Sequence, residues 1–246
     1  MSQVKLGDKN IPFIYQGSNL LYPNPVKDGL VLWYDFKGMK NSDVSKGVAK
    51  DLSDNGNNGT LQNLAYTDTS GYNNSLYLDG VDDYIKLNDK NEKIYKSKSL
   101  TIEMTLEFLE TPDGWRWLIS NSVDSIGSKG FSIAYSINNP AGIAFRTGNN
   151  SVDTGFKPTI GKTFHIIARI SEDKGMRTVI NGDKINNNTA LKDLEHSDLY
   201  ISIGRASYYA SPHLKTSIKN VRIYNRSLTD QEIQYNYQLE KERWGL

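Results

Sequence analysis

The sequence predicts an all-β protein in which two antiparallel sheets pack face to face, with a small N-terminal β-meander and one short C-terminal helix. Three observations support this class. Apolar runs are short and separated by turns rich in Gly and Asn, 15 tyrosines are present, and a single segment near the C-terminus has helical periodicity. A sandwich of 246 residues commonly forms one domain.

Residues 1–24 are predicted to form the small β-meander, because short apolar segments alternate with polar turns. The expected strands are Val4–Leu6, Ile11–Tyr15 and Leu20–Tyr22. This unit buries too little apolar surface to be stable alone, so we expect it to pack on the following domain or on a partner protein. Pro23 and Pro25 favour an extended linker, which places a boundary between residues 1–24 and 25–246.

The remaining strands are predicted from their patterns. Leu30–Phe36 is mostly apolar, and Ser75–Gly80 with Asp83–Leu87 forms a hairpin. Leu100–Phe108 alternates, with Ile102 and its apolar neighbours on one face and the polar residues on the other, so a half-buried strand is expected. The other expected strands are Trp115–Ser120, Phe131–Ile137, Gly142–Arg146, Phe164–Ile170, Arg177–Ile180, Leu199–Ile203 and Ile218–Tyr224.

One helix is predicted at Thr229–Leu239. Thr229 followed three residues later by Glu232 has the spacing of a capping box, and Ile233 and Tyr237 are four residues apart and share one face.

Charge and cysteine content exclude several classes of binding partner and of chemistry. Lys and Arg number 29 against 28 Asp and Glu, which removes the simplest electrostatic reason to bind nucleic acid or an anionic membrane. No apolar run reaches the roughly 18 residues needed to cross a bilayer, and the N-terminus lacks the apolar stretch of a secretory signal. The absence of Cys excludes disulfides, thiol catalysis and cysteine-ligated zinc.

Five segments resemble successive signatures of laminin-G-like, concanavalin-A-like domains, and they occur in the family's order. The segments are Gly29–Phe36, Asp51–Gly59, Leu78–Ile85, Ser99–Glu103 and Ile218–Ile233. The resemblance implies a jelly-roll sandwich that binds carbohydrate or protein, sometimes with calcium, and we expect a non-enzymatic module. It names no ligand, because one fold hosts many functions.

The two ends of the chain suggest the kind of assembly to which the protein belongs. Val4–Tyr22 looks like strand-turn repeats of tail proteins from phages of Gram-positive bacteria, and Glu232–Leu246 is similar to closing segments of phage virion proteins. These resemblances imply a tail, baseplate or fibre protein made in the host cytoplasm and released with the virion by lysis. The meander would bind other virion proteins, the particle would hold the protein as an oligomer, and the sandwich would bind a host-surface glycan or a neighbouring virion protein.

Aromatic residues are the candidates for recognition. Trp115 and Trp117 lie two apart and project from one side of a strand, where they form either a sugar platform or part of the core. Tyr208 and Tyr209 follow a strand in a polar stretch, with Arg205 nearby to donate hydrogen bonds, so they either contact a ligand or belong to a plain loop.

Two groups of carboxylates are candidates for metal binding or catalysis. Asp79, Asp82 and Asp83 could supply oxygen ligands to calcium, which would be the only cofactor, although Asp also caps tight turns. Glu103 and Glu107 resemble the acid pair of Glu-x-Asp-x-Glu glycoside hydrolases, but Thr105 stands at the central position.

The main functional hypothesis is therefore a virion component that binds a host glycan or a virion protein. The alternatives are a capsid or tail decoration protein and a glycan-degrading hydrolase.

Overall fold

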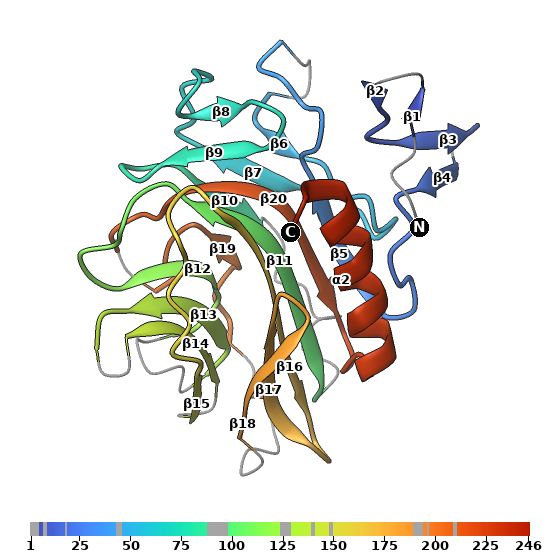
Figure 1. Cartoon of the computed structure of the whole chain (residues 1–246). Helices are drawn as coiled ribbons and strands as arrows, with labels where there is room; N and C mark the ends of the chain where they lie inside the picture. Colours follow the sequence, from blue (N-terminus) through green and yellow to red (C-terminus); the bar gives the residue numbers. More distant parts are fainter. Residues whose placement is uncertain are drawn as a thin grey trace.

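The computed structural model describes residues 5–6, 9–17, 19–42, 46–87, 98–123, 129–138, 141–147, 150–188, 194–195, 197–208 and 211–246. Two antiparallel sheets pack face to face in this part of the chain, and α2 (Asp230–Trp244) lies at one side of the molecule (Figure 1). The predicted jelly-roll sandwich is confirmed. No helix in the described ranges is long and apolar enough to cross a membrane.

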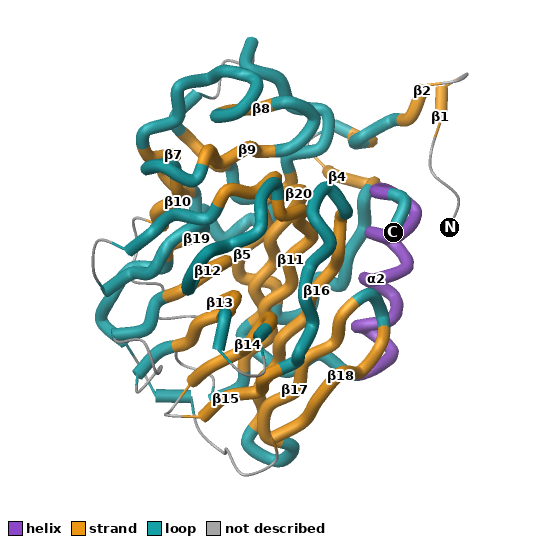
Figure 2. Tube along the Cα trace, turned by 60° about the vertical axis from the view of Figure 1, so that its left-hand side comes forward, coloured by secondary structure: helices purple, strands orange, loops and turns teal. Residues whose placement is uncertain are grey.

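The sheet that α2 covers is named the helix sheet. Its strands run in the order β18 (Asp183–Asn188), β17 (Gly175–Ile180), β16 (Thr163–Ser171), β11 (Leu100–Phe108), β20 (Lys215–Tyr224), β9 (Leu76–Asp79) and β8 (Gly71–Tyr72), and β5 (Leu30–Asp35) also pairs with β20. The long strands β11, β16 and β20 lie at its centre, as the rotated view in Figure 2 also shows.

The other sheet is named the open sheet. Its strands run in the order β15 (Asn150–Asp153), β14 (Gly142–Thr147), β13 (Phe131–Ser136), β12 (Arg116–Ser120), β19 (Ser202–Ile203), β10 (Tyr84–Leu87), β7 (Gly59–Gln62) and β6 (Val48–Ala49). In Figure 1, β12 to β15 lie on the opposite side of the molecule from α2.

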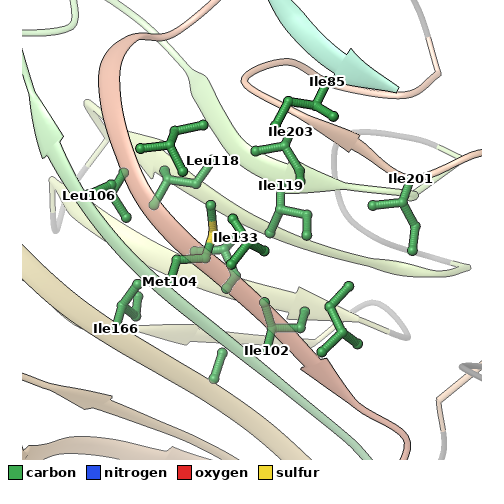
Figure 3. Close-up of a cluster of buried hydrophobic side chains, with 14 of the residues drawn as sticks. Ile85, Ile102, Met104, Leu106, Leu118, Ile119, Ile133, Ile166, Ile201 and Ile203 are labelled. Atoms are coloured by element: carbon green, nitrogen blue, oxygen red, sulfur yellow. The ribbon is translucent and has the colours of Figure 1, made fainter. Parts of the chain in front are cut away.

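The core fills the space between the two sheets with branched and aromatic side chains. Ile102 and Met104 of β11 face Ile119 of β12 and Ile133 of β13, and all four are fully buried (Figure 3). This interdigitation of inner faces is what holds two sheets together at the spacing of a sandwich.

Helix α2 begins where the capping box predicts. The Thr229 hydroxyl accepts a bond from the backbone N–H of Glu232 at 3.2 Å, and the Glu232 carboxylate accepts from the backbone N–H of Thr229 at 2.8 Å. The helix is longer than predicted: it runs to Trp244 and ends at Gly245, whose φ of 71° suits a left-handed cap. Polar residues in its last turns are buried, so tertiary contacts extend the helix beyond its apolar pattern.

The outer face of the helix sheet is therefore covered. Ile233 of α2 packs into a cluster with Trp33 and Tyr224. The expectation of a half-buried strand at Leu100–Phe108 was wrong, because α2 covers the polar face of β11 and leaves Glu103 with no exposed surface.

The N-terminal segment contains β1 (Lys5–Leu6), β2 (Lys9–Asn10), β3 (Ile14–Gln16) and β4 (Asn19–Tyr22), which form two small two-stranded sheets. Part of this segment packs on the sandwich: Leu20 contacts the cluster that contains Trp33, and the Tyr235 hydroxyl of α2 donates to the Asn24 carbonyl at 2.9 Å. The predicted boundary after residue 24 stays a prediction, but the segment already has a surface to rest on within its own chain.

Candidate functional site

The outer face of the open sheet carries an aromatic group because β12 changes register there. A bulge between Trp117 and Ile119 in the pairing with β13 lets both Leu118 and Ile119 enter the core, while Trp117 lies outside it. Trp117 packs over Ala134 and Ala206, two small residues that leave room for its ring. The residue is only 2% exposed, so it forms the floor of the site.

Half-buried side chains surround this floor. Trp115 stacks on Trp117 with ring centroids 6.1 Å apart and planes at 29°, and Tyr208 meets Trp117 edge-on at 6.1 Å. The Arg146 guanidinium of β14 lies 4.3 Å from the centre of the Trp115 ring. These four residues, Trp115, Trp117, Arg146 and Tyr208, are named the aromatic cluster. Its half-buried members offer amphipathic rings and a cation on a sheet face that no helix in the described part of the chain covers.

Arg146 is held between an acid and an aromatic surface. Asp153 on the neighbouring strand β15 lies 3.8 Å away, and the side chains of Arg146 and Asp153 are 18% and 39% exposed. Burial lowers the pKa of the guanidinium, while Asp153 and Tyr208 act in the opposite direction. Arginine stays charged under all such conditions, so the cluster presents hydrogen-bond donors beside its rings.

The structure brings together two of the predicted recognition residues and places a third, Arg205, at a different ring. Trp115 and Tyr208, far apart in sequence, both contact Trp117. Arg205 instead lies over the ring of Tyr84 on β10, with its guanidinium carbon 4.8 Å from the ring centre. Tyr209 lies outside the described residues.

Arg146 and Tyr84 are recognition candidates that sequence reasoning missed. The signal was present as strand parity, since Arg146 and the outward-facing Ala144 are two residues apart on β14. Parity alone did not say which face of the sheet would remain uncovered.

The three acidic residues between β9 and β10 do come together, but β9 lies in the helix sheet and β10 in the open sheet, so the hairpin predicted for these two segments was wrong. One carboxylate oxygen from each of Asp79, Asp82 and Asp83 lies within 4.8 Å of the others. Turn capping uses part of the set: Asp79 Oδ1 accepts from the backbone N–H of Val81 at 2.8 Å, and Asp83 Oδ2 accepts from that of Asp79 at 3.0 Å.

Asp83 has capacity beyond turn capping. Its side chain is fully buried, its Oδ1 has no hydrogen-bond partner among the described residues, and burial raises the pKa of the carboxyl, opposed by hydrogen bonds from Ser70 and Asp79. A hard cation that takes carboxylate oxygens fits such a group, and Asp79, Asp82 and Asp83 would hold it. Calcium binding stays a prediction.

Glu103 and Glu107 do not form an open acid pair. Glu103 Oε1 lies 2.6 Å from Arg222 and 2.9 Å from His165 Nε2, and Glu103 Oε2 accepts from Asn236 of α2 at 2.8 Å. The Glu107 side chain is 19% exposed and lies 3.3 Å from Lys219. The expectation that both glutamates belong to an exposed polar face is wrong for Glu103, whose partners hold α2 on the sheet.

Comparisons with known proteins agree with this architecture. The sequence profile described as the concanavalin A-like lectin/glucanases superfamily matches residues 78–234. Among solved structures, Trypanosoma rangeli sialidase is similar over 87% of this chain and 33% of its own, with a TM-score of 0.62 and 16% identity. The receptor binding domain of botulinum neurotoxin C/D mosaic serotype is similar over 87% of this chain and 52% of its own, with a TM-score of 0.60 and 18% identity.

The chain therefore spans about a third of the sialidase and about half of the toxin domain. A search of curated protein sequences found no significant match.

These comparisons correct one expectation. The resemblance was taken to imply a non-enzymatic module, and that inference was wrong, because the similar structures include sialidases, among them one in complex with sialic acid. At 16% identity the likeness shows the fold alone, and this fold occurs in enzymes and in receptor-binding domains.

Proposed function

Because the chain belongs to the concanavalin A-like lectin/glucanases superfamily, we propose that it binds carbohydrate, and that the aromatic cluster on the open sheet is the contact surface. The observation that carries the proposal is the half-buried Trp115, which stacks on Trp117 beside the cation of Arg146. A sugar has an apolar ring face and a rim of hydroxyl groups, so an aromatic ring next to a guanidinium and a carboxylate suits both parts.

Each member of the cluster has a distinct role in this proposal. Trp115 and Tyr208 offer apolar surface to the sugar ring, and they lose little conformational entropy on binding because each has only two side-chain torsions. Arg146 donates hydrogen bonds to the sugar hydroxyl groups, and Asp153, whose carboxylate lies 3.8 Å from Arg146, accepts hydrogen bonds from them. Trp117 supports the rings from below, since it is only 2% exposed.

The test compares glycan binding by the wild type and by Trp115→Ala on a glycan array, followed by affinity measurement on the retained glycans. Loss of a hot-spot aromatic costs about 2 kcal/mol or more, which is roughly a thirtyfold loss of affinity. The matched control is Tyr235→Ala, because Tyr235 is 37% exposed and lies on α2 on the far side of the molecule. Equal affinities of wild type and Trp115→Ala, with unchanged melting, would disprove this site.

We further propose that the protein is a virion component, in the tail, baseplate or fibre, and that its ligand is a host-surface glycan. The N-terminal resemblance to phage tail proteins supports this setting, and residues 1–24 would contact neighbouring virion proteins. Two small sheets with exposed Leu6, Tyr15 and Leu21 offer apolar side chains for such a contact. A chain that lacks residues 1–24 should be absent from particles assembled in its presence. Normal incorporation of this truncated chain would contradict the attachment role.

A further inference from the structure

We propose that the ligand is an extended, largely uncharged polysaccharide chain, because a second cation–aromatic group lies on the same face of the open sheet. This group, named the second subsite, consists of Tyr84, Lys86, Tyr200 and Arg205. The inference rests on the proposed carbohydrate-binding function and names the class of glycan.

The second subsite lies on the outer face because of the strand alternation on β10. Ile85 and Leu87 point into the core between the sheets, so Tyr84 and Lys86 point outward. Lys86 pairs across the strands with Ser202 of β19, and β19 pairs in turn with β12. The two groups therefore share one continuous hydrogen-bonded sheet.

The contacts of the second subsite resemble those of the aromatic cluster. Lys86 Nζ lies 4.6 Å from the centre of the Tyr200 ring, and the Arg205 guanidinium carbon lies 4.8 Å from that of Tyr84. The imidazole of His213 lies beside the Tyr84 ring, with ring centroids 5.8 Å apart. The four members of the second subsite and His213 are all half-buried, so each keeps an exposed part. Ring faces with adjacent cations thus occur twice on this surface.

The spacing of the two groups requires a ligand longer than one sugar. Strand β10 is separated from β12 by β19, so Tyr84 and the Trp115–Trp117 pair are two strand spacings apart. At about 4.8 Å per spacing, strands β10 and β12 are about 10 Å apart. The backbone of Arg146 on β14 lies two spacings beyond β12, about 10 Å farther. One sugar ring cannot contact both groups, whereas linked sugars can lie across the strands.

One loop joins the two groups. Ala206 packs under Trp117, and the preceding residue, Arg205, reaches over Tyr84. Both groups are thereby held by the same turn that follows β19, and Ser202 of that strand donates to the Arg205 carbonyl at 2.8 Å. The distance between them is fixed before a ligand arrives, which reduces the entropy lost on binding.

The charges on this face favour an uncharged chain over a polyanion. Acids lie among the cations near both groups: Asp153 lies 3.8 Å from Arg146, and Asp79 and Asp82 lie near His213, which flanks Tyr84 beside Arg205. A surface that mixes both signs gains little from a polyanion, whose charges would meet the acids too. Donors and acceptors next to aromatic rings suit the hydroxyl groups of neutral sugars.

The experiment uses affinity gel electrophoresis of the full chain in gels that contain dextran, mannan, galactomannan or mixed-linkage β-glucan, with hyaluronan as the polyanionic comparison. We expect retention by a neutral polysaccharide and much weaker binding of its disaccharide. Tyr84→Ala and Trp115→Ala should each weaken polysaccharide binding about tenfold or more, whereas Tyr235→Ala should leave it unchanged. Lys86→Gln, a milder change at the second subsite, should weaken it in the same direction.

The outcomes separate the inference from the proposed function. If Trp115→Ala abolishes binding while Tyr84→Ala and Lys86→Gln leave it intact, the second subsite is wrong and the proposed function stands. If hyaluronan alone is retained, the uncharged class is wrong. If neither variant changes the retention seen with the wild type, or if nothing is retained, the proposed function and this inference both fail. Circular dichroism melting of each variant shows whether a loss of binding reflects unfolding.

Discussion

Replacing Glu103 by Gln removes one negative charge from a fully buried network beneath α2. The carboxylate accepts hydrogen bonds from Arg222 at 2.6 Å, from His165 at 2.9 Å and from Asn236 at 2.8 Å. Arg222 retains a second partner, the Glu240 carboxylate of α2. The substitution keeps the volume of the side chain, so the effect isolates charge and hydrogen bonding from packing.

We expect Glu103→Gln to lower the free energy of unfolding by about 3 to 5 kcal/mol, because breaking a buried ion pair leaves the remaining charge without solvent or full compensation. The glutamine amide also places a donor where the carboxylate accepted from the side chain of Asn236 or His165. For a chain of this length, about 2–4 °C in melting temperature corresponds to each kcal/mol, so a fall of roughly 6 to 20 °C is expected.

The measurement is thermal and denaturant unfolding of the wild type, Glu103→Gln and a control on the same strand. Glu107→Gln is the matched control, because that side chain keeps 19% of its surface exposed, and its ion-pair partner among the described residues, Lys219, also donates to Ser217, so the change should cost clearly less than Glu103→Gln. A double variant, Glu103→Gln with Arg222→Met, should be less unstable than the sum of its single changes. Equal melting temperatures of the Glu103→Gln and Glu107→Gln proteins would refute the reasoning.

Three further predictions concern pH, calcium and the N-terminus. Burial alone would raise the pKa of Glu103 and of Glu240, but the neighbouring arginines outweigh it and both pKa values are lowered. The stabilising effect of the two carboxylates is therefore present above pH 4.5 and is lost as the pH falls further. Melting temperatures measured across acidic pH check this, and a flat profile would contradict it. Calcium should raise the melting temperature of the wild type but not of Asp83→Asn, and identical melting in calcium and in chelator would end that prediction. Deleting residues 1–24 should lower the melting temperature modestly by uncovering the apolar surface that Leu20 contacts, and unchanged melting would show that the segment adds no stability.

The sequence predicted those structural features that depend on residues close together in the chain. The capping box at Thr229 and Glu232 predicted the start of α2, because its hydrogen bonds join residues three apart. The end of α2 could not be predicted in the same way. Arg243 pairs with Asp35 of β5, so the last turns form through a contact with a strand near the other end of the chain.

The burial of charged residues on β11 could not be predicted from the sequence, because helix α2 covers this strand from outside. Alternation along β11 correctly separated the two faces of the strand, but alternation cannot tell water from a covering helix. A carboxylate such as Glu103 suggests solvent exposure until its partners are known, and Arg222 and Asn236 lie on elements more than a hundred residues away. The sequence contained these partners, and only the fold placed them together.

The candidate site shows the same division between residue type and location. The spacing of Trp115 from Trp117 and the loop position of Tyr208 each predicted a recognition residue from nearby sequence alone. Their meeting depends on β19 pairing with β12, which places Ala206 beside Trp117, and no pattern in either segment encodes that neighbour. A surface built across strands in this way recognises shape at a fixed spacing. The proposed glycan would have to span this spacing, so the shortest chain that binds tests the arrangement most directly.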